Sequence, residues 1–391
     1  MSIQTKEQFN TRVKEIQSTE NYKNPWAFGI TKVDFGQINK EKILQAHFPT
    51  INWNENFGSA AIFIDALKKS GITINQNESE QIFTINSTFL SHCLDSFLPF
   101  LDEAKGDVHK NIQVIQHLAK QNDLQAFRLV FIFEDEAPKS VESVYLKLYA
   151  LSLAKAELRS LNLNGAFGLL PNVAWKGNMP LELDYLRANE IEWKINGIYP
   201  QIDMVDKFPR FLQHIIPADN TRILDASKVR FGAQLAAGTT IMPGASYVNF
   251  NAGTMGPVMV EGRISSSAIV GAGSDVGGGA SILGVLSGTD GNPISIGKNT
   301  LLGANSVTGI PLGDGCIVDA GMTILAGTKI SIEKEELEKL NAINGNVIKS
   351  TLVKAKELAG LNGIHFRTDS TNGKILAKRS TREVKLNADL H

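Results

Sequence analysis

The sequence predicts a mixed fold: an N-terminal α/β domain over residues 1–218, a left-handed parallel β-helix over residues 219–331, and a C-terminal helix and strands over residues 332–391. Of the 34 glycines, 21 fall in the second of these ranges. Aliphatic residues recur there with a fixed period, and tryptophan and histidine are absent from it. The first range instead mixes amphipathic helical patterns with short apolar runs, as expected for an α/β domain.

Composition excludes several classes of protein. Lys and Arg number 39 against 40 Asp and Glu, so the net charge of -1 favours neither nucleic acid nor an anionic membrane as a partner. The two cysteines, Cys93 and Cys316, cannot build a disulfide framework, and we expect a cytoplasmic protein. The N-terminus is polar and carries no apolar signal segment. The longest strand-like apolar run is Leu129 to Phe133, which is too short to span a membrane.

The N-terminal part alternates predicted helices with a predicted strand. Apolar residues three and four apart predict helices over Lys6–Ile16, Ser59–Leu67, Thr88–Leu101 and Lys110–Ala119. The run Arg128–Phe133 is rich in β-forming residues and predicts a strand, and Ser140–Leu158 predicts a helix after it. Asp135, Glu136 and Glu142 lie at this strand-to-helix junction. Acidic residues at such junctions usually cap a helix or face solvent, so we do not interpret them as a site.

Aliphatic residues recur every six positions in the glycine-rich segment. Most units place a small residue four positions after the aliphatic residue, and glycine one or three positions after it. This period is typical of a parallel β-helix of triangular section with about 18 residues per coil, so about five to six coils fit here. Hexapeptide repeats of this class wind left-handed, against the usual crossover rule. The aliphatic positions are Val229, Leu235, Ile241, Val258, Ile264, Val270, Val276, Ile282, Ile296, Leu302, Leu312, Val318, Ile324 and Ile330.

The six-residue frame breaks twice, at Tyr247–Pro257 and at Gly284–Pro293. Extra residues in a regular solenoid usually emerge as loops on one face, often the binding face. We therefore interpret both breaks as inserted loops. The alternative is that they are tolerated surface insertions without a role.

One carboxylate stands out in the repeat. The segment contains no histidine, which removes both a histidine base and a three-histidine zinc site from within it. Its only glutamate, Glu261, falls three positions after Val258, in a slot that is glycine in eight other hexads. Such a break in a local rule is expected at functional sites. The alternative is a surface pair between Glu261 and Arg263, worth less than about 1 kcal/mol.

Residues close to Glu261 in sequence suit ligand binding. Arg263 has a planar guanidinium that can hold a carboxylate by two hydrogen bonds. Near Ser281, the glycines at 277–279 would let backbone N–H groups face a ligand, although they also suit close packing of coils.

Several longer strings of the sequence closely resemble the tetrahydrodipicolinate N-succinyltransferase family, in the longer form typified by actinobacterial and pseudomonad enzymes. The resemblance covers roughly the last two thirds of the chain. The strings are FGLLPNVAW (167–175), NFNAGT (249–254), MVEGRIS (259–265), VGAGSDVGGGASILGVLSG (270–288), ISIGKNTLLGANS (294–306), AGTKI (326–330), VKAKELAG (353–360), HFRTDS (365–370) and LNADLH (386–391).

This resemblance implies a homotrimer of left-handed β-helices with active sites between neighbouring subunits. It implies transfer of succinyl from succinyl-CoA to the amino group of L-2-amino-6-oxopimelate, the hydrated ring-opened form of tetrahydrodipicolinate, in the succinylase branch of diaminopimelate and lysine biosynthesis. It also leaves open a Mg²⁺ ion on the trimer axis.

The resemblance assigns site residues as well. Glu261 would be the catalytic carboxylate. The acceptor would be bound by Arg263, Gly278, Ser281, Asp319 and Ala320. Coenzyme A would lie along Ala304, Gly327, Lys354, Arg367 and Ser370. The chain departs from the family pattern at Asp319, where glutamate is usual, and at Arg367–Ser370, where the family is more basic.

Two questions stay open at this point. Glu261 can act as general base towards the attacking amine, or as a nucleophile that forms a transient acyl anhydride. The alternatives for the whole protein are a hexapeptide-repeat N-acyltransferase with another amine acceptor, and a non-enzymatic β-helix scaffold.

Overall fold

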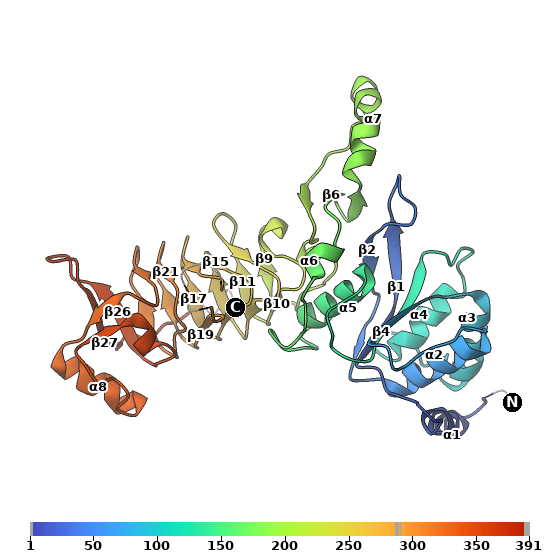
Figure 1. Ribbon diagram of the computed structural model, residues 1–391, viewed down its shortest axis with the longest axis horizontal. Helices are drawn as coiled ribbons and strands as arrows, with labels where there is room; N and C mark the ends of the chain where they lie inside the picture. Colours follow the sequence, from blue (N-terminus) through green and yellow to red (C-terminus); the bar gives the residue numbers. More distant parts are fainter. Residues whose placement is uncertain (1–2, 286–288, 290, 387–391) are drawn as a thin grey trace. The chain divides into compact units, whose positions relative to one another are not determined.

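The computed structural model describes residues 3–285, 289 and 291–386. Figure 1 shows the order of its helices and strands along the chain. The second frame break, Gly284–Pro293, and the LNADLH string fall partly outside the described residues. No helix among the described residues is both long enough and apolar enough to cross a membrane.

The chain forms two compact units. The first contains Met1–Ala150 and Leu161–Phe208, and the second contains Leu151–Ser160 and Pro209–His391. The predicted division at residues 218/219 and 331/332 remains a prediction. The structure adds that the short segment Leu151–Ser160 belongs with the second unit.

The first unit is built on an antiparallel sheet with strand order β2-β1-β5-β4, and β3 pairs with β1. The strands are β1 (Ala27–Phe35), β2 (Ile43–His47), β3 (Asn52–Trp53), β4 (Glu80–Thr84) and β5 (Phe127–Ile132). A second, three-stranded sheet has the order β7-β6-β8. It contains β6 (Val173–Lys176), β7 (Met179–Leu181) and β8 (Met204–Asp206).

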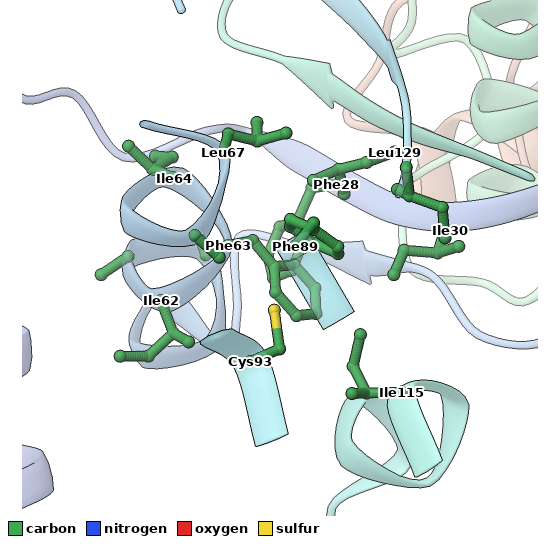
Figure 2. Packing of buried hydrophobic residues seen from close by; sticks show 14 of the residues in the cluster. Phe28, Ile30, Ile62, Phe63, Ile64, Leu67, Phe89, Cys93, Ile115 and Leu129 are labelled. Carbon is green, nitrogen blue, oxygen red and sulfur yellow. The ribbon is translucent and has the colours of Figure 1, made fainter. Parts of the chain in front are cut away.

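The helices of this unit confirm the amphipathic patterns. The apolar faces of the first four helices bury one core with the sheet, in which Phe63, Phe89 and Ile115 from three of these helices meet Phe28 and Leu129 from β1 and β5 (Figure 2). The lone Cys93 is buried in this core. The helices are α1 (Lys6–Gln17), α2 (Phe57–Lys69), α3 (Ser87–Phe97), α4 (Lys110–Leu118), α5 (Val141–Ser152), α6 (Ala166–Leu169), α7 (Leu183–Ile195) and the 3₁₀ turn η1 (Leu98–Phe100).

One expectation for this unit was wrong, and another holds only in part. The helix predicted over Ser140–Leu158 ends at Ser152, because the chain turns at Ala154, which has φ +53°. At the acidic junction Glu136 is exposed, as expected, but Asp135 accepts a hydrogen bond of 2.7 Å from the buried Lys147 ammonium, and Glu142, in the first turn of α5, is buried. Desolvation raises the pKa of Glu142.

The second unit is a parallel β-helix, which confirms the meaning of the six-residue period. Its short strands form three sheets, with the orders β10-β13-β16-β19, β9-β11-β14-β17-β20-β22 and β12-β15-β18-β21-β23, and these neighbours pair in parallel. The strands are β9 (Arg222–Ile223), β10 (Gln234–Leu235), β11 (Thr239–Ile241), β12 (Tyr247–Val248), β13 (Gly253–Thr254), β14 (Val258–Val260), β15 (Arg263–Ile264), β16 (Ile269–Val270), β17 (Ser274–Val276), β18 (Ser281–Ile282), β19 (Ser295–Ile296), β20 (Leu301–Leu302), β21 (Val307–Thr308), β22 (Ile317–Val318) and β23 (Thr323–Ile324).

The C-terminal residues extend the second of these sheets. Its order continues from β22 through β26 and β27 to β24 and β25. These strands are β24 (Lys329–Ser331), β25 (Leu352–Lys354), β26 (Ile364–Thr368) and β27 (Ile375–Arg379), and helix α8 (Lys334–Asn344) lies between β24 and β25 in the chain. Three 3₁₀ turns complete the unit: η2 (Phe211–Gln213), η3 (Ala226–Lys228) and η4 (Ala355–Leu358).

The register of the strands corrects the repeat frame at two places. In the second sheet Val260, not Val258, is paired with Ile241 and Val276. The first frame break is not an inserted loop either, because Tyr247–Pro257 carries β12 and β13. The aliphatic pattern fails there because the position equivalent to Val270 is the fully buried Thr254.

A segment from the first half of the chain braces one edge of the β-helix. Arg159 donates hydrogen bonds to Ser267 O (2.6 Å), Ile294 O (2.7 Å) and Ser295 Oγ (2.9 Å), and its backbone N–H donates to Asn251 Oδ1 (2.8 Å). Arg159 therefore links three successive coils through one side chain and its own backbone.

We expect Arg159→Ala to destabilise the β-helix unit by about 2 kcal/mol, since charged hydrogen bonds to backbone carbonyls are lost. Arg159→Lys is the matched control: it keeps the charge but not the planar fork, so its loss should be intermediate. Chemical denaturation followed by circular dichroism measures both. Equal stability of wild type and Arg159→Ala would contradict the bracing role.

Candidate active site

Glu261 lies on the corner between the second and third sheets of the β-helix. Its backbone N–H donates to Val276 O (2.8 Å), the Gly277 N–H donates to Leu302 O (2.8 Å), and the Gly303 N–H donates to Val318 O (2.8 Å). Glu261, Gly277, Gly303 and Asp319 therefore follow one another on successive coils, about 4.8 Å apart. We call these four positions the corner line.

The corner line explains why Glu261 breaks the local pattern. A Cβ on Gly277 would lie 2.6 Å from Leu302 O, and a Cβ on Gly303 would lie 2.5 Å from Ala320 N. Glycine is thus required in these coils by close backbone approach. The slot of Glu261 was wrongly identified from the sequence, since Glu261 follows the inward Val260 directly. Glu261 nevertheless occupies a position at which the next two coils have glycine, Gly277 and Gly303.

Beside the corner line runs a second line of small residues. The Asn305 N–H donates to Gly278 O (2.9 Å), and the Gly321 N–H donates to Ala304 O (2.8 Å). Gly278, Ala304 and Ala320 consequently stack on successive coils. The structure brings together on one edge three residues that the resemblance divided between the acceptor and coenzyme A, and we call them the small-residue line.

The Glu261 carboxylate lies over the start of the small-residue line. A Cβ on Gly278 would be 3.5 Å from Glu261 Oε2, which is ordinary van der Waals contact. Glu261 is half-buried, and within the described part of the chain its carboxylate forms no hydrogen bond or ion pair. The alternative of a surface pair with Arg263 is therefore wrong.

Arg263 and Ser281 are direct neighbours. They pair across β15 and β18, where Arg263 is exposed and Ser281 is buried. Since Arg263 lies two residues after Glu261, the carboxylate, the guanidinium and the hydroxyl come from one corner of two adjacent coils.

At the far end of the corner line, Asp319 belongs to a separate ionic cluster. Its carboxylate accepts a hydrogen bond from His365 Nε2 (2.7 Å) and another from Arg367 Nε (3.2 Å). Strand β26 brings both residues there by pairing in parallel with β22. Two coils, those of Gly277 and Gly303, separate Asp319 from Glu261, so the two carboxylates lie about 14 Å apart along the edge.

His365 was not predicted as a site residue. The repeat itself contains no histidine, but β26 supplies one to the end of the same sheet. The available signal was the alternation in HFRTDS, where residues 365 and 367 share one face of a strand.

The remaining predicted coenzyme A residues lie around the C-terminal extension of the sheet. Lys354 pairs with Lys329 across β24 and β25, and the Ala355 N–H donates to Thr328 O (2.8 Å), which places Lys354 close to the exposed Gly327. Ser370 is exposed in the turn between β26 and β27, three residues after Arg367.

Two other chemistries find little support at this edge. Burial raises the pKa of the Cys316 thiol to about 11, so it is protonated at neutral pH and a poor nucleophile. In residues 3–285, 289 and 291–386, no group of three or more His, Cys, Asp or Glu side chains is arranged to hold a metal ion. A Mg²⁺ ion on a trimer axis would involve several chains and remains a prediction.

The hexapeptide coils and the edge carboxylate place the chain in the class of hexapeptide-repeat transferases. A model described as Tetrahydrodipicolinate N-succinyltransferase N-terminal matches residues 7–168, and the corresponding middle-domain model matches residues 170–210. The model Hexapeptide repeat of succinyl-transferase matches residues 293–326. The first of these matches includes the N-terminal residues that the resemblance did not cover.

Whole-chain relatives agree with these matches. The 2,3,4,5-tetrahydropyridine-2,6-dicarboxylate N-succinyltransferase of Sulfurovum sp. (strain NBC37-1) is 68% identical, covering 100% of this chain and 99% of the relative. That of Sulfurimonas denitrificans is 65% identical, covering 100% and 99%. A crystal structure of a 2,3,4,5-tetrahydropyridine-2-carboxylate N-succinyltransferase from Campylobacter jejuni is 58% identical with a TM-score of 0.93, covering 98% of this chain and 100% of that one. The chain belongs to the tetrahydrodipicolinate N-succinyltransferase family.

We expect two adjacent glycine substitutions to differ sharply in stability. Gly277→Ala forces a Cβ against Leu302 O and should cost about 1–3 kcal/mol, as overpacking does. Gly278→Ala meets no backbone atom within 4 Å and should leave stability unchanged or slightly raised. Thermal denaturation of both variants measures this, and equal melting temperatures would contradict the corner geometry.

Proposed function

We propose that this protein transfers succinyl from succinyl-CoA to the amino group of L-2-amino-6-oxopimelate, in the succinylase branch of diaminopimelate and lysine biosynthesis. Relatives that match the whole chain carry the name of this N-succinyltransferase. Succinyl-CoA is the acyl donor. The observation that carries the assignment is the Glu261 carboxylate, which has no partner in the described chain and lies over Gly278 at the head of a line of small residues.

Glu261 performs the proton transfer in this proposal. The acceptor amine must lose a proton as it attacks the thioester carbonyl, and Glu261 takes that proton directly or through water. A C–N bond forms, the C–S bond breaks, and coenzyme A leaves with its sulfur. The alternative sequence starts with attack of the carboxylate itself, which gives an acyl anhydride that the amine then opens.

Acceptor binding is assigned to the corner beside Glu261. Arg263 is exposed, and its guanidinium has no partner within the described residues. Its planar fork suits one carboxylate of the dicarboxylate acceptor. Ser281, on the neighbouring strand, adds a hydroxyl, and Gly278 leaves room for the reacting amine next to Glu261.

The donor is assigned to the small-residue line. The pantetheine arm of succinyl-CoA would run from Gly278 past Ala304 to Ala320, where no long side chain blocks it. Arg367, Lys354, Gly327 and Ser370 then meet the nucleotide end, with cations for its phosphates. Asp319 accepts a hydrogen bond from Arg367 and lies two intervening coils away from Glu261 of the same chain, so its assignment to the acceptor requires that it meet Glu261 of another subunit.

The assembly we propose is a cytoplasmic homotrimer with active sites between subunits. Glu261 and Arg263 lie on an outer edge of the β-helix, which another copy can cover. A closed site would exclude water, which strengthens electrostatic interactions with the transition state.

A carboxylate on the donor path favours an acyltransferase over a scaffold. The decisive assay is release of coenzyme A from succinyl-CoA, with and without the cyclic dicarboxylate acceptor. Acetyl-CoA and a panel of other amines test the alternative of an N-acyltransferase with another acceptor. No thioester cleavage with any pair would support the scaffold.

Glu261→Gln should keep the fold and lose at least about 10²-fold in kcat, the low end for loss of a general base. The expected cause is that the amide cannot accept the amine proton. Coenzyme A release measures the rate. Glu338→Gln, at an exposed position of helix α8, is the matched control and should keep full activity. Wild-type turnover in Glu261→Gln would refute its role.

Arg367→Gln should raise KM for succinyl-CoA about tenfold with little change in kcat, which corresponds to about 1.4 kcal/mol of binding. The physical reason is loss of a cation at the nucleotide end of the donor path. Arg187→Gln is the control, because Arg187 is also an exposed arginine paired with an aspartate, Asp184. An unchanged KM in Arg367→Gln would contradict the assigned donor path.

A further inference from the structure

Asn305 lies on the same edge as Glu261, and neither the repeat pattern nor the family resemblance assigned it a role. It occupies a corner with φ +55°, and its side chain is exposed. Its backbone N–H donates to Gly278 O (2.9 Å), so it belongs to the coil directly after that of Gly278. Its carboxamide has no hydrogen-bond partner among the described residues.

The side chains of Glu261 and Asn305 reach towards the same coil from opposite sides. A Cβ on Gly278 would lie 3.5 Å from Glu261 Oε2, and a Cβ on the next residue, Gly279, would lie 2.3 Å from Asn305 Oδ1. The Gly279 N–H donates to Glu261 O (3.2 Å), which joins the first two of these coils, and the Asn305 N–H bond to Gly278 O joins the second to the third. Because Gly278 and Gly279 have no Cβ, the Glu261 carboxylate and the Asn305 carboxamide can both lie over this corner.

The positive φ at position 305 is by itself a sufficient reason for an asparagine there. Asparagine tolerates the left-handed region better than most residues. Asn299 shows this, since it has φ +52°, is exposed, and would have its Oδ1 in a clash with a Cβ placed on Gly273. Asn299 occupies the corner between the first and second sheets, because it lies between β19 and β20, whereas Asn305 lies between β20 and β21. The two residues share their conformation, and only Asn305 occupies the corner of the β-helix that also carries Glu261.

We propose that Asn305 is a second catalytic residue, whose Nδ2–H group donates a hydrogen bond to the thioester carbonyl oxygen of the bound acyl donor. This role rests on the proposed function. As the amine nitrogen bonds to the carbonyl carbon, the C=O electron pair moves onto oxygen, and the Asn305 amide stabilises the resulting oxyanion. The pair then re-forms C=O, the C–S bond breaks, the thiolate of coenzyme A leaves, and the amine proton passes to Glu261.

A Cβ on Gly279 would clash with Asn305 Oδ1, so the Asn305 carboxamide packs over the Gly279 corner. Neither end of this carboxamide has a hydrogen-bond partner among the described residues, so Nδ2 is available to donate. A donor that already lies beside the reacting groups requires little reorganisation when charge develops on the carbonyl oxygen.

Matched pairs of variants separate catalysis from backbone conformation. Asn305→Gly and Asn299→Gly each keep a residue suited to positive φ, and Asn305→Asp and Asn299→Asp each keep the shape while removing the NH₂ donor. Coenzyme A release with succinyl-CoA and acceptor gives kcat and KM, and thermal denaturation gives stability. We expect both Asn305 variants to lose at least about 10²-fold in kcat, the loss typical for one oxyanion donor. The Asn299 variants should retain the wild-type kcat, and the two members of each pair should melt at similar temperatures.

Each other outcome is decisive. A kcat for Asn305→Gly within about threefold of that for Asn299→Gly would overturn the catalytic role, since it amounts to less than about 1 kcal/mol of transition-state stabilisation. A raised KM with unchanged kcat would overturn it too, because it indicates equal binding of ground and transition states. If wild type releases no coenzyme A, the proposed function fails and the role of Asn305 falls with it. If wild type is active and only the Asn305 result is negative, the proposed function stands.

Discussion

Close stacking of backbone corners is the constraint on which the rest of this β-helix depends. Successive coils approach so closely at Gly277 and Gly303 that a single Cβ would contact the carbonyl or amide of the next coil at 2.5–2.6 Å. The edge is therefore built mainly from backbone, with N–H and C=O groups paired between coils. A long side chain on such an edge is an exception, and the two on the corner line, Glu261 and Asp319, are the two carboxylates of the candidate site.

The six-residue period predicted the three sheets because each face of the prism needs one inward residue per coil. The six-residue frame gave wrong inward residues where the faces of a coil differ in their number of residues. The step from the inward Val260 to the inward Ile264 is four residues instead of six, and a uniform six-residue frame therefore selected Val258. It failed again at Thr254, which faces inward although polar, because its hydroxyl is 2.6 Å from that of Thr239. A polar residue whose hydroxyl is hydrogen-bonded inside the β-helix cannot be recognised from a pattern of aliphatic residues.

Residues that reach their place by long-range pairing were also beyond a local pattern. The buried Lys147 neutralises Asp135, which local reasoning had left on a solvated face. His365 joins Asp319 only because β26 pairs with β22, a register that nothing in the intervening helix or turns specifies. Glu261, in contrast, was selected despite a wrongly assigned slot, and its role as the catalytic carboxylate stays a prediction. Its chemical type, the only glutamate among the glycines, carried more information than its assigned position in the repeat.

The geometry of the edge also relates the two halves of the proposed reaction. A ligand that lies along the small-residue line passes a backbone corner about every 4.8 Å. An arm that contains amide groups, such as pantetheine, can therefore form hydrogen bonds with successive corners. Along the adjacent corner line, Glu261 and Asp319 are three coil spacings apart, about 14 Å. One straight edge therefore has the candidate catalytic carboxylate at one end and an arginine that donates to Asp319 at the other. The glycines of the corner line allow the coils to stack, and the adjacent small-residue line leaves the donor a path between these ends. Packing and ligand binding therefore select small residues at neighbouring positions of each coil.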